Sequence, residues 1–377
     1  MDRLDCHCHV FNIVNVGLGA ILKQLDSADE RLFLIDKIKK LAELIRIFTG
    51  NSKTILDGLD KHYGKKYKLF PLMFDGDFLL ESYREEHWLY IKGFFDEVEK
   101  SIRDKDIKQD IKVVLDFIEK LKTRKIGFED QREELIELSQ DPNYTDRIFP
   151  FLGVDPRRGG IKSYFVDNVG DGKVFAGIKV YPPNGFSPCD EVLVGKGSIF
   201  EYCSENQIPV VSHCSYGGFA TLAMSIDVNG MIIPAGETEP KEWNGKCNFS
   251  EGLCNGFKKM VQERAGVLNN PKIWKEVLKK YNNLILVLAH FGNHSDEWQD
   301  DILRMLQNSD YPNLYTDVSC MNDSKILRKV RDIYYDNPDI QDKILYGSDY
   351  FMNVLKEDFS DYLNRMKRYF GKDMFES

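Results

Sequence analysis

The segment Leu284-Ile285-Leu286-Val287-Leu288-Ala289 is the longest purely apolar run of the chain, and His290 follows it directly. An apolar run of this length is typical of a strand buried in a parallel sheet. It is far shorter than the roughly 20 residues that a membrane-spanning helix needs, so we expect no membrane span. Similar short runs recur along the chain with helical stretches between them, which is the pattern of βα units around a parallel sheet.

Eight such runs predict eight strands, at residues 4–8, 67–74, 148–154, 174–180, 208–212, 284–289, 314–318 and 344–347. Amphipathic stretches, whose apolar residues recur at intervals of three and four, lie between them at 31–48, 97–122, 131–139, 273–281, 296–306 and 324–335. Eight strands with helical crossovers predict an α/β fold, a (β/α)8 TIM barrel. Because we find no internal repeat and no Pro/Ser-rich linker, we expect residues 1–377 to form a single domain.

Two intervals are too long for the crossovers of a bare barrel. Residues 75–147 predict a helical insertion after the second strand, and residues 214–270, which are rich in Gly and Asn, predict a long loop after the fifth strand. Both would emerge at the C-terminal face of the barrel, where the active sites of this fold lie. We therefore expect both segments to shape a site.

The charge balance limits the possible partners. The 377 residues contain 60 Asp and Glu against 51 Lys and Arg, which gives a net charge of −9. This is the wrong sign for a protein whose affinity comes from neutralising phosphates, so nucleic acid is not the expected partner. We expect a small-molecule substrate and no membrane, and a homo-oligomer is compatible with the sequence.

Cysteine usage and the N-terminal segment indicate the compartment. The eight cysteines form no CxxC pair, which favours reduced thiols and a cytoplasmic setting. Residues 10–22 are mostly apolar, but they lack a positively biased leader and a small-residue cleavage pattern. We interpret them as part of the mature protein.

The first predicted strand ends in Asp5-Cys6-His7-Cys8-His9. Alternate side chains of a strand share a face, so His7 and His9 point the same way at the barrel mouth, where imidazoles are suited to a divalent metal ion. Cys6 and Cys8 alternate with them and are expected to face the helical layer as packing residues. On its own, a polar strand end without a metal explains this motif equally well.

Further candidates follow other strands directly. His213 follows the run 208–212, His290 follows 284–289, and Asp349 closes the eighth run. Because the C-terminal ends of barrel strands converge, we expect these side chains to form one site with His7 and His9. A histidine satisfied within the core could explain any one of them, but not all of them together.

Five segments taken together resemble the amidohydrolase superfamily, in its amidohydrolase-related (amidohydrolase 2) branch of metal-dependent TIM-barrel hydrolases, decarboxylases and hydratases. The resemblance implies His7, His9, His213 and Asp349 as the metal shell and His290 as an acid/base histidine. The matching segments run in family order over nearly the whole chain: DCHCH at 5–9, FAGIKVYP at 175–182, PVVSH at 209–213, LVLAHFG at 286–292 and LYGSD at 345–349.

The chemistry of these groups agrees with the resemblance. Three imidazoles and a carboxylate leave room for water on a divalent ion, which lowers the pKa of that water and supplies a nucleophile. One ion is favoured over two, and zinc is the expected metal, although manganese, iron and cobalt fit similar ligands. We expect Asp349 both to ligate the ion and to accept a proton, while His290 polarises a carbonyl or protonates a leaving group.

Four further residues are candidates for substrate binding. Lys179 stands near the end of the fourth strand, where it can contact substrate as a cation, carry a carbamate that bridges two metals, or form an ion pair at the rim. Arg157 and Arg158 follow the third strand, and one of them can clamp a substrate carboxylate; a solvated turn is the alternative. Tyr216, with two glycines after it, is expected to line the pocket from the 214–270 segment.

These observations favour a metal-dependent hydrolase that acts on a small carboxylated, amide or ester substrate through metal-activated water. A decarboxylase or hydratase of an unsaturated carboxylic acid would use the same site, so this lyase alternative stays open. A metal-binding barrel that has lost turnover is the third hypothesis. A nuclease is disfavoured, because a lysine stands where such barrels carry a strand-4 carboxylate and because the chain is acidic.

Overall fold

The computed structural model describes residues 3–12, 31–81, 85–123, 127–350, 352–354, 357–371 and 373–375. Within this part of the chain, one parallel strand falls in each of the eight predicted runs. These strands are β1 (Arg3–Cys8), β2 (Tyr67–Pro71), β3 (Phe151–Val154), β4 (Gly177–Val180), β5 (Val210–His213), β8 (Leu286–Ala289), β9 (Leu314–Asp317) and β10 (Ile344–Leu345).

The strands follow one another in space as they do in sequence. β1 pairs with β2, and a six-stranded sheet runs in the order β10-β9-β8-β5-β4-β3. Two sets of backbone contacts connect these two sheets. Parallel bridges at Leu69–Ile148 and Leu72–Phe151 join β2 to the start of β3, and the Cys6 amide donates to the Tyr346 carbonyl at 3.0 Å. Although the ladder is not continuous, the strand order is that of a (β/α)8 barrel, and the predicted fold class is confirmed.

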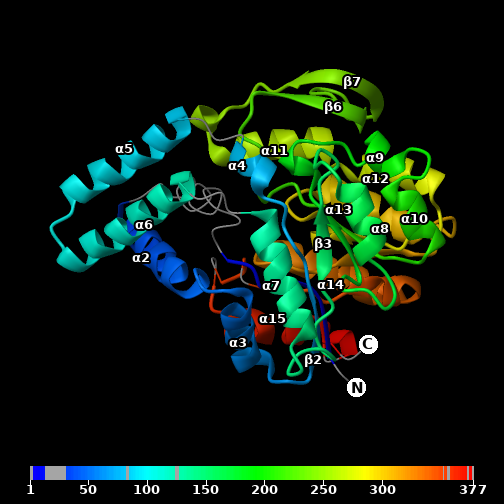
Figure 1. Ribbon diagram of the computed structural model, residues 1–377, viewed down its shortest axis with the longest axis horizontal. Helices are drawn as coiled ribbons and strands as arrows, with labels where there is room; N and C mark the ends of the chain where they lie inside the picture. Colours follow the sequence, from blue (N-terminus) through cyan, green and yellow to red (C-terminus); the bar gives the residue numbers. More distant parts are fainter. Residues whose placement is uncertain are drawn as a thin grey trace.

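Helices surround the strands (Figure 1) and bury their apolar faces against them. The predicted helices at 31–48 and 296–306 are confirmed residue for residue as α2 (Arg31–Phe48) and α13 (Asp296–Leu306). The other helices that follow strands are α3 (Ser52–Tyr63), α8 (Ile161–Asn168), α9 (Glu191–Val194), α10 (Ile199–Glu205), α12 (Pro271–Lys280), α14 (Ser324–Asp336) and α15 (Phe359–Phe370).

The insertion after β2 is helical, as predicted, but it is divided differently. It contains α4 (Asp77–Glu81), α5 (Glu85–Ser101), α6 (Lys105–Thr123) and α7 (Phe128–Gln140). The expected single helix over 97–122 is wrong, because Asp104 accepts hydrogen bonds from the amides of Asp106 and Ile107 and so begins a new helix. Figure 1 shows α5 and α6 extending as an arm away from the strands.

The segment after β5 is not the long loop that we expected. It contains an antiparallel hairpin, β6 (Ser225–Ile232) with β7 (Lys241–Asn248), and then α11 (Phe257–Leu268). Only a few hairpin side chains are buried, and most of the others are exposed. The alternation of apolar and polar residues that marks a strand is therefore weak in this sequence.

A buried arginine links the parts of this insertion to one another. The Arg264 side chain of α11 is fully buried, and it donates to the carbonyls of Thr221 and Ala223 at 3.1 Å each. Its guanidinium group also lies 4.3 Å from the centre of the Phe249 ring. One side chain of α11 thus contacts both the segment that leads into the hairpin and the segment that follows it.

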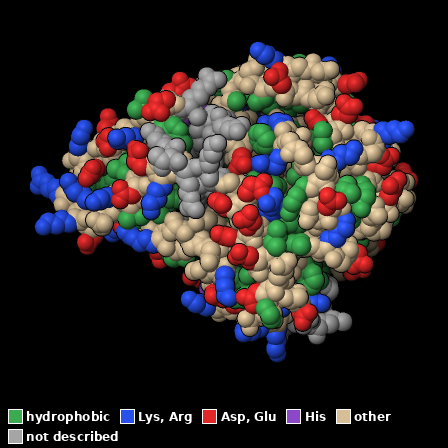
Figure 2. Space-filling view, viewed as in Figure 1, with side chains coloured by type: hydrophobic (Ala, Val, Ile, Leu, Met, Phe, Trp, Pro, Cys, Tyr) green, Lys and Arg blue, Asp and Glu red, His purple; other side chains and the backbone are tan. Residues whose placement is uncertain are grey.

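No helix in the described ranges is both long enough and apolar enough to cross a membrane. The segment 10–22, which we interpret as mature protein, lies mostly outside the described residues. Acidic and basic side chains are interspersed over the face shown in Figure 2, so the described part of this face carries no uniform charge.

Candidate metal centre

A pocket lies at the C-terminal ends of the barrel strands, on the face expected from the fold. It brings together six of the residues that the sequence marks as candidates, and all six are buried. They are His7, His9, Lys179, His213, His290 and Asp349.

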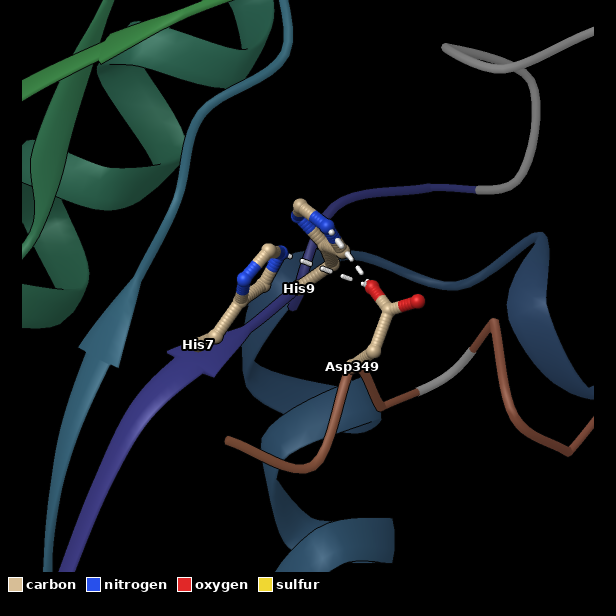
Figure 3. Close-up of side chains that lie close together, drawn as sticks. All are labelled: His7, His9 and Asp349. Carbon is tan, nitrogen blue, oxygen red and sulfur yellow. Dashed lines mark ion pairs between the residues drawn. The ribbon is translucent and has the colours of Figure 1, made fainter. Parts of the chain in front are cut away.

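Two imidazoles from β1 and one carboxylate from beyond β10 converge at the centre of this pocket (Figure 3). Asp349 Oδ1 lies 3.6 Å from His7 Nε2 and 3.2 Å from His9 Nε2. The Asp349 amide also donates to the His7 carbonyl at 2.7 Å, so the carboxylate is tied to the strand that carries both histidines. The alternation of β1 thus places His7 and His9 on one face, as the sequence predicts.

The opposite nitrogen of each of these two imidazoles is held by an acceptor. His7 Nδ1 lies 2.9 Å from Asp317 Oδ2, and His9 Nδ1 lies 2.8 Å from the Leu72 carbonyl. Since both partners can only accept, the hydrogen of each neutral ring belongs on Nδ1 and the Nε2 lone pair faces Asp349. Histidines that bind metals in proteins are oriented by this type of contact.

These donor atoms fit a divalent ion. Ligands at about 2.1 Å in a tetrahedral zinc site lie about 3.4 Å from one another. The separations of 3.2 and 3.6 Å around Asp349 Oδ1 bracket this value. The two histidines and the carboxylate form one of the described groups able to hold a metal ion, and His7, His290 and Asp317 form another.

His213 and His290 extend the site from β5 and from the end of β8. His290 Nε2 lies 3.1 Å from His213 Nδ1, and His213 Nε2 lies 2.9 Å from the Gly217 carbonyl. The Tyr181 ring stacks on His213 with 4.3 Å between the ring centres. His213 is therefore in the pocket but outside the cluster of His7, His9 and Asp349, so its role as a ligand stays a prediction.

Sequence reasoning missed Asp317. This carboxylate is fully buried at the end of β9, and besides His7 it accepts from the amides of His290 and Ser319 at 3.0 Å each. Burial by itself would raise the pKa of Asp317, but attraction to His7 and the hydrogen bonds from His7 and Ser319 lower it instead. The available signal was a charged residue at a strand end, the same signal that pointed to Asp349.

Burial also sets the protonation of the histidines. It lowers the pKa of His7, and it lowers the pKa of His290, with help from the neighbouring His7, to about 3. The pKa of His213 is likewise held well below its usual value by burial and by His290. Neutral imidazoles are the form that binds metal ions and that can accept protons.

Lys179 is the other unusual charge of the pocket. Its side chain on β4 is buried, and its Nζ has no hydrogen-bond partner among the residues that the structure describes. Burial lowers the pKa of Lys179 to about 8. An unpaired buried ammonium costs stability, which favours a role toward a ligand over an ion pair at the rim.

Arg157 and Arg158 do not line this pocket in the described chain. Arg157 binds the Asp155 carboxylate at 2.8 and 2.6 Å. Arg158 binds Asp75 at 2.8 and 2.6 Å and Asp77 at 2.7 Å. Both arginines thus bind carboxylates of the chain itself, and contact of either one with a substrate stays a prediction.

Tyr216 also points elsewhere. Its ring lies 5.4 Å from the Trp298 ring, and it borders a separate hollow between α11 and α13. The segment after β5 nevertheless forms part of the pocket wall, as expected, through Ser215, Gly218 and Phe219. The segment was therefore placed correctly, but the Tyr216 side chain is not among those that line this pocket.

The backbone is left-handed at three pocket residues that follow strands. His290, Cys320 and Asp349 have φ angles of 69°, 57° and 49°. Such conformations cost about 1–3 kcal/mol each and are typical of functional sites, where the surrounding structure holds them. Here they turn the chain sharply at the ends of β8, β9 and β10.

The chain belongs to the amidohydrolase family, since the family model for amidohydrolases matches residues 4–370. The superfamily consists of metal-dependent enzymes, and the two candidate histidine and aspartate groups agree with this. No curated protein matches the chain.

The chain is also similar, at low identity, to solved structures. An uncharacterised TIM-barrel protein from Bordetella bronchiseptica is 15% identical over 62% of this chain and 64% of that one, with a TM-score of 0.37, so the chain covers less than two thirds of its length. An amidohydrolase from Burkholderia multivorans with bound zinc is 12% identical over 64% and 71%, with a TM-score of 0.38. A 5-carboxyvanillate decarboxylase from Sphingomonas paucimobilis is 9% identical over 100% and 99%, with a TM-score of 0.43.

Proposed function

We propose that this protein is a metal-dependent hydrolase of a small carboxylated, amide or ester substrate. One observation carries the proposal: His7 Nε2, His9 Nε2 and Asp349 Oδ1 converge in a pocket that Lys179 also lines, and no described residue bonds to Lys179 Nζ. A cluster of metal-ligand atoms beside a cation is suited to a substrate that carries a negative charge.

His7, His9, His213 and Asp349 would hold the ion. When bound, a divalent metal ion supplies Lewis-acid chemistry and lowers the pKa of water. Zinc is the proposed ion, and one ion is favoured because Lys179 stands as an uncarbamylated cation in this proposal. Asp349 accepts a proton at Oδ2, the oxygen that points away from the two imidazoles in Figure 3.

Other residues of the pocket orient the substrate. Lys179 binds an anionic group of the substrate through Nζ, and His290 polarises a carbonyl or transfers a proton at Nε2. Four apolar side chains also line the pocket and exclude water from the reacting bond: Phe11, Phe74, Phe219 and Met352. The proposed substrate is thus a small molecule with one anionic end and an apolar part.

The experiment that tests this function is a product screen with the metal-loaded protein. Candidate carboxylic acids, amides and esters are incubated with it, and amine, alcohol and carbon dioxide are measured. Release of an amine or alcohol supports hydrolysis, whereas carbon dioxide release would establish the lyase alternative. Tight metal binding without turnover over a broad panel would establish the non-catalytic alternative. Lys179→Met should abolish any activity found without changing the metal content.

We further propose a cytoplasmic location. The seven cysteines whose side chains the structure describes are all free of disulfides, five of them buried. This supports a reducing setting, as expected from the absence of a CxxC pair in the sequence. Fractionation of cells that produce the protein, with detection in the cytoplasmic fraction, tests this location.

A further inference from the structure

Ser319 connects the buried carboxylate of Asp317 to His290. Its hydroxyl donates to Asp317 Oδ1, and its Oγ lies 2.8 Å from His290 Nδ1. Ser319 and Asp317 are both fully buried. Asp317 therefore contacts two histidines of the site, His7 directly through Oδ2 and His290 through Ser319.

The direction of these hydrogen bonds follows from the number of hydrogens. A hydroxyl has one hydrogen, and a carboxylate can only accept. If Ser319 donates to Asp317, its oxygen must accept from His290, so the hydrogen of His290 belongs on Nδ1. The Ser319 carbonyl, 3.4 Å from the same Nδ1, is a second acceptor that favours this tautomer.

The tautomer of His290 also determines the tautomer of the neighbouring His213. With its hydrogen on Nδ1, His290 presents the lone pair of Nε2 to His213 Nδ1 at 3.1 Å. His213 must then carry its own hydrogen on Nδ1, which leaves its Nε2 unprotonated. The Gly217 carbonyl, 2.9 Å from that Nε2, cannot donate a hydrogen, so in this tautomer two lone pairs face each other and the contact is repulsive. A metal ion that binds Nε2 removes this repulsion.

We infer that Ser319 is a positioning residue that sets the tautomers of His290 and His213. Because the Asp317 carboxylate can only accept, Ser319 donates to it, His290 donates to Ser319, and His213 donates to His290. This deepens the proposed function, on which the metal-ligand role of His213 rests. This chain of hydrogen bonds runs from His213 through His290 and Ser319 to Asp317. It makes Nε2 of His213 a competent ligand, and it means that His290 polarises a carbonyl or transfers a proton only after its Nε2 has first accepted one.

The test is ¹⁵N NMR of the full-length protein labelled on its histidine rings, because protonated and unprotonated ring nitrogens have well-separated shifts. His290→Asn assigns the His290 signals by their loss. Spectra of the metal-free and the zinc-loaded protein should both show the hydrogen of His290 on Nδ1. In Ser319→Ala this preference should be lost, and in Ser319→Thr, which keeps the hydroxyl, it should return.

A matched control is Ser187→Ala, since Ser187 is a fully buried serine whose hydroxyl donates to a backbone carbonyl, that of Met231, at 2.6 Å. The zinc dissociation constant should rise about tenfold in Ser319→Ala and stay unchanged in the control. A hydrogen on Nε2 of His290 in the unmutated protein, or an unaltered tautomer in Ser319→Ala, would overturn the inference. If no zinc binds, the proposed function fails, but the tautomer in the metal-free chain still decides the role of Ser319.

Discussion

His9 Nε2 and Asp349 Oδ1 lie 3.2 Å apart, although 340 positions separate the two residues along the chain, from 9 to 349. The first strand and the last one meet at this point, because the Cys6 amide bonds to the Tyr346 carbonyl and the Asp349 amide bonds to the His7 carbonyl. The candidate metal centre therefore lies where the first strand, β1, contacts the last strand, β10. The geometry of the centre depends on the correct pairing of these two strands.

We predict that replacing His7 and His9 together with Ala abolishes stoichiometric metal binding, because two of the converging nitrogens are lost. The barrel should remain folded, since metal binding is not what holds its strands. Elemental analysis gives the metal content, and circular dichroism checks the fold. His62→Ala, which removes an exposed imidazole bonded to Ser360, is the control and should bind metal normally. An unchanged metal content in the double variant would refute the site.

Asp349→Asn should lower turnover by roughly 10²-fold or more, because an amide cannot accept the proton. Metal affinity should fall as well, since Asp349 also contributes a ligand oxygen. His290→Asn should still bind stoichiometric metal at saturating zinc, with an affinity weakened about tenfold as in Ser319→Ala, while turnover falls. Loss of the metal from His290→Asn would make His290 a ligand and our division of roles wrong, and full activity would make it structural.

Lys179→Met should stabilise the protein at pH 7. Burial lowers the pKa of Lys179 from 10.5 to about 8, so below pH 8 the folded state bears the full cost of a buried ammonium. As the pH rises from 8 to 10.5 the folded lysine loses its proton first, and this cost disappears. The free energy of unfolding should thus rise by roughly 1–3 kcal/mol at neutral pH and by much less near pH 10.

Urea unfolding at the two pH values measures this change, and Lys173→Met is the matched control, since Lys173 is an exposed lysine bonded to the Val166 carbonyl. A variant that is equally destabilised at both pH values would show that Lys179 contributes packing and that its charge costs nothing.

Gly218→Ala should weaken metal binding, whereas Gly236→Ala should not. Both glycines have positive φ, of 107° and 82°, so both substitutions strain the backbone. A methyl group at Gly218 would lie 2.6 Å from the Tyr181 hydroxyl and 2.8 Å from His213 Nε2, while at Gly236 nothing lies within 4 Å. Titration calorimetry measures the zinc affinity of both variants. Equal affinities would show that the part of the pocket wall at Gly218 does not position His213.

Arg158→Ala should destabilise the fold by about 2–4 kcal/mol, because it leaves the buried Asp75 carboxylate without its cation. The KM for a substrate found in the product screen should not change. Arg46→Ala, which removes an arginine that is 48% exposed and paired with Asp110, should cost less than about 1 kcal/mol. A stable Arg158→Ala protein with a greatly raised KM would restore the substrate clamp expected from sequence.

The sequence predicted those parts of the fold and site that local patterns encode. β8 and His290 were found because an apolar run ends abruptly at a histidine, and the alternation of β1 paired His7 with His9. Asp317 was missed because the polar Tyr315 and Thr316 blur its run, which we extended through Val318, so the carboxylate did not mark a strand end.

Local sequence patterns do not predict which distant residues will pair. Arg158 and Asp75 lie 83 positions apart, and no spacing rule connects them. The same holds for Tyr216, whose ring packs against Trp298 and whose amide donates to the Asn293 carbonyl, both far away in the sequence. Tertiary packing decides such choices after the strands have been placed.

We propose that one metal ion is held where the first and last strands meet. An anomalous difference map at the zinc edge, from crystals of the zinc-loaded protein, tests this site directly. We expect one strong peak within about 2.3 Å of His7 Nε2, His9 Nε2 and the Asp349 carboxylate. A map with no peak among these three side chains, or with the ion bound elsewhere on the barrel, would contradict it.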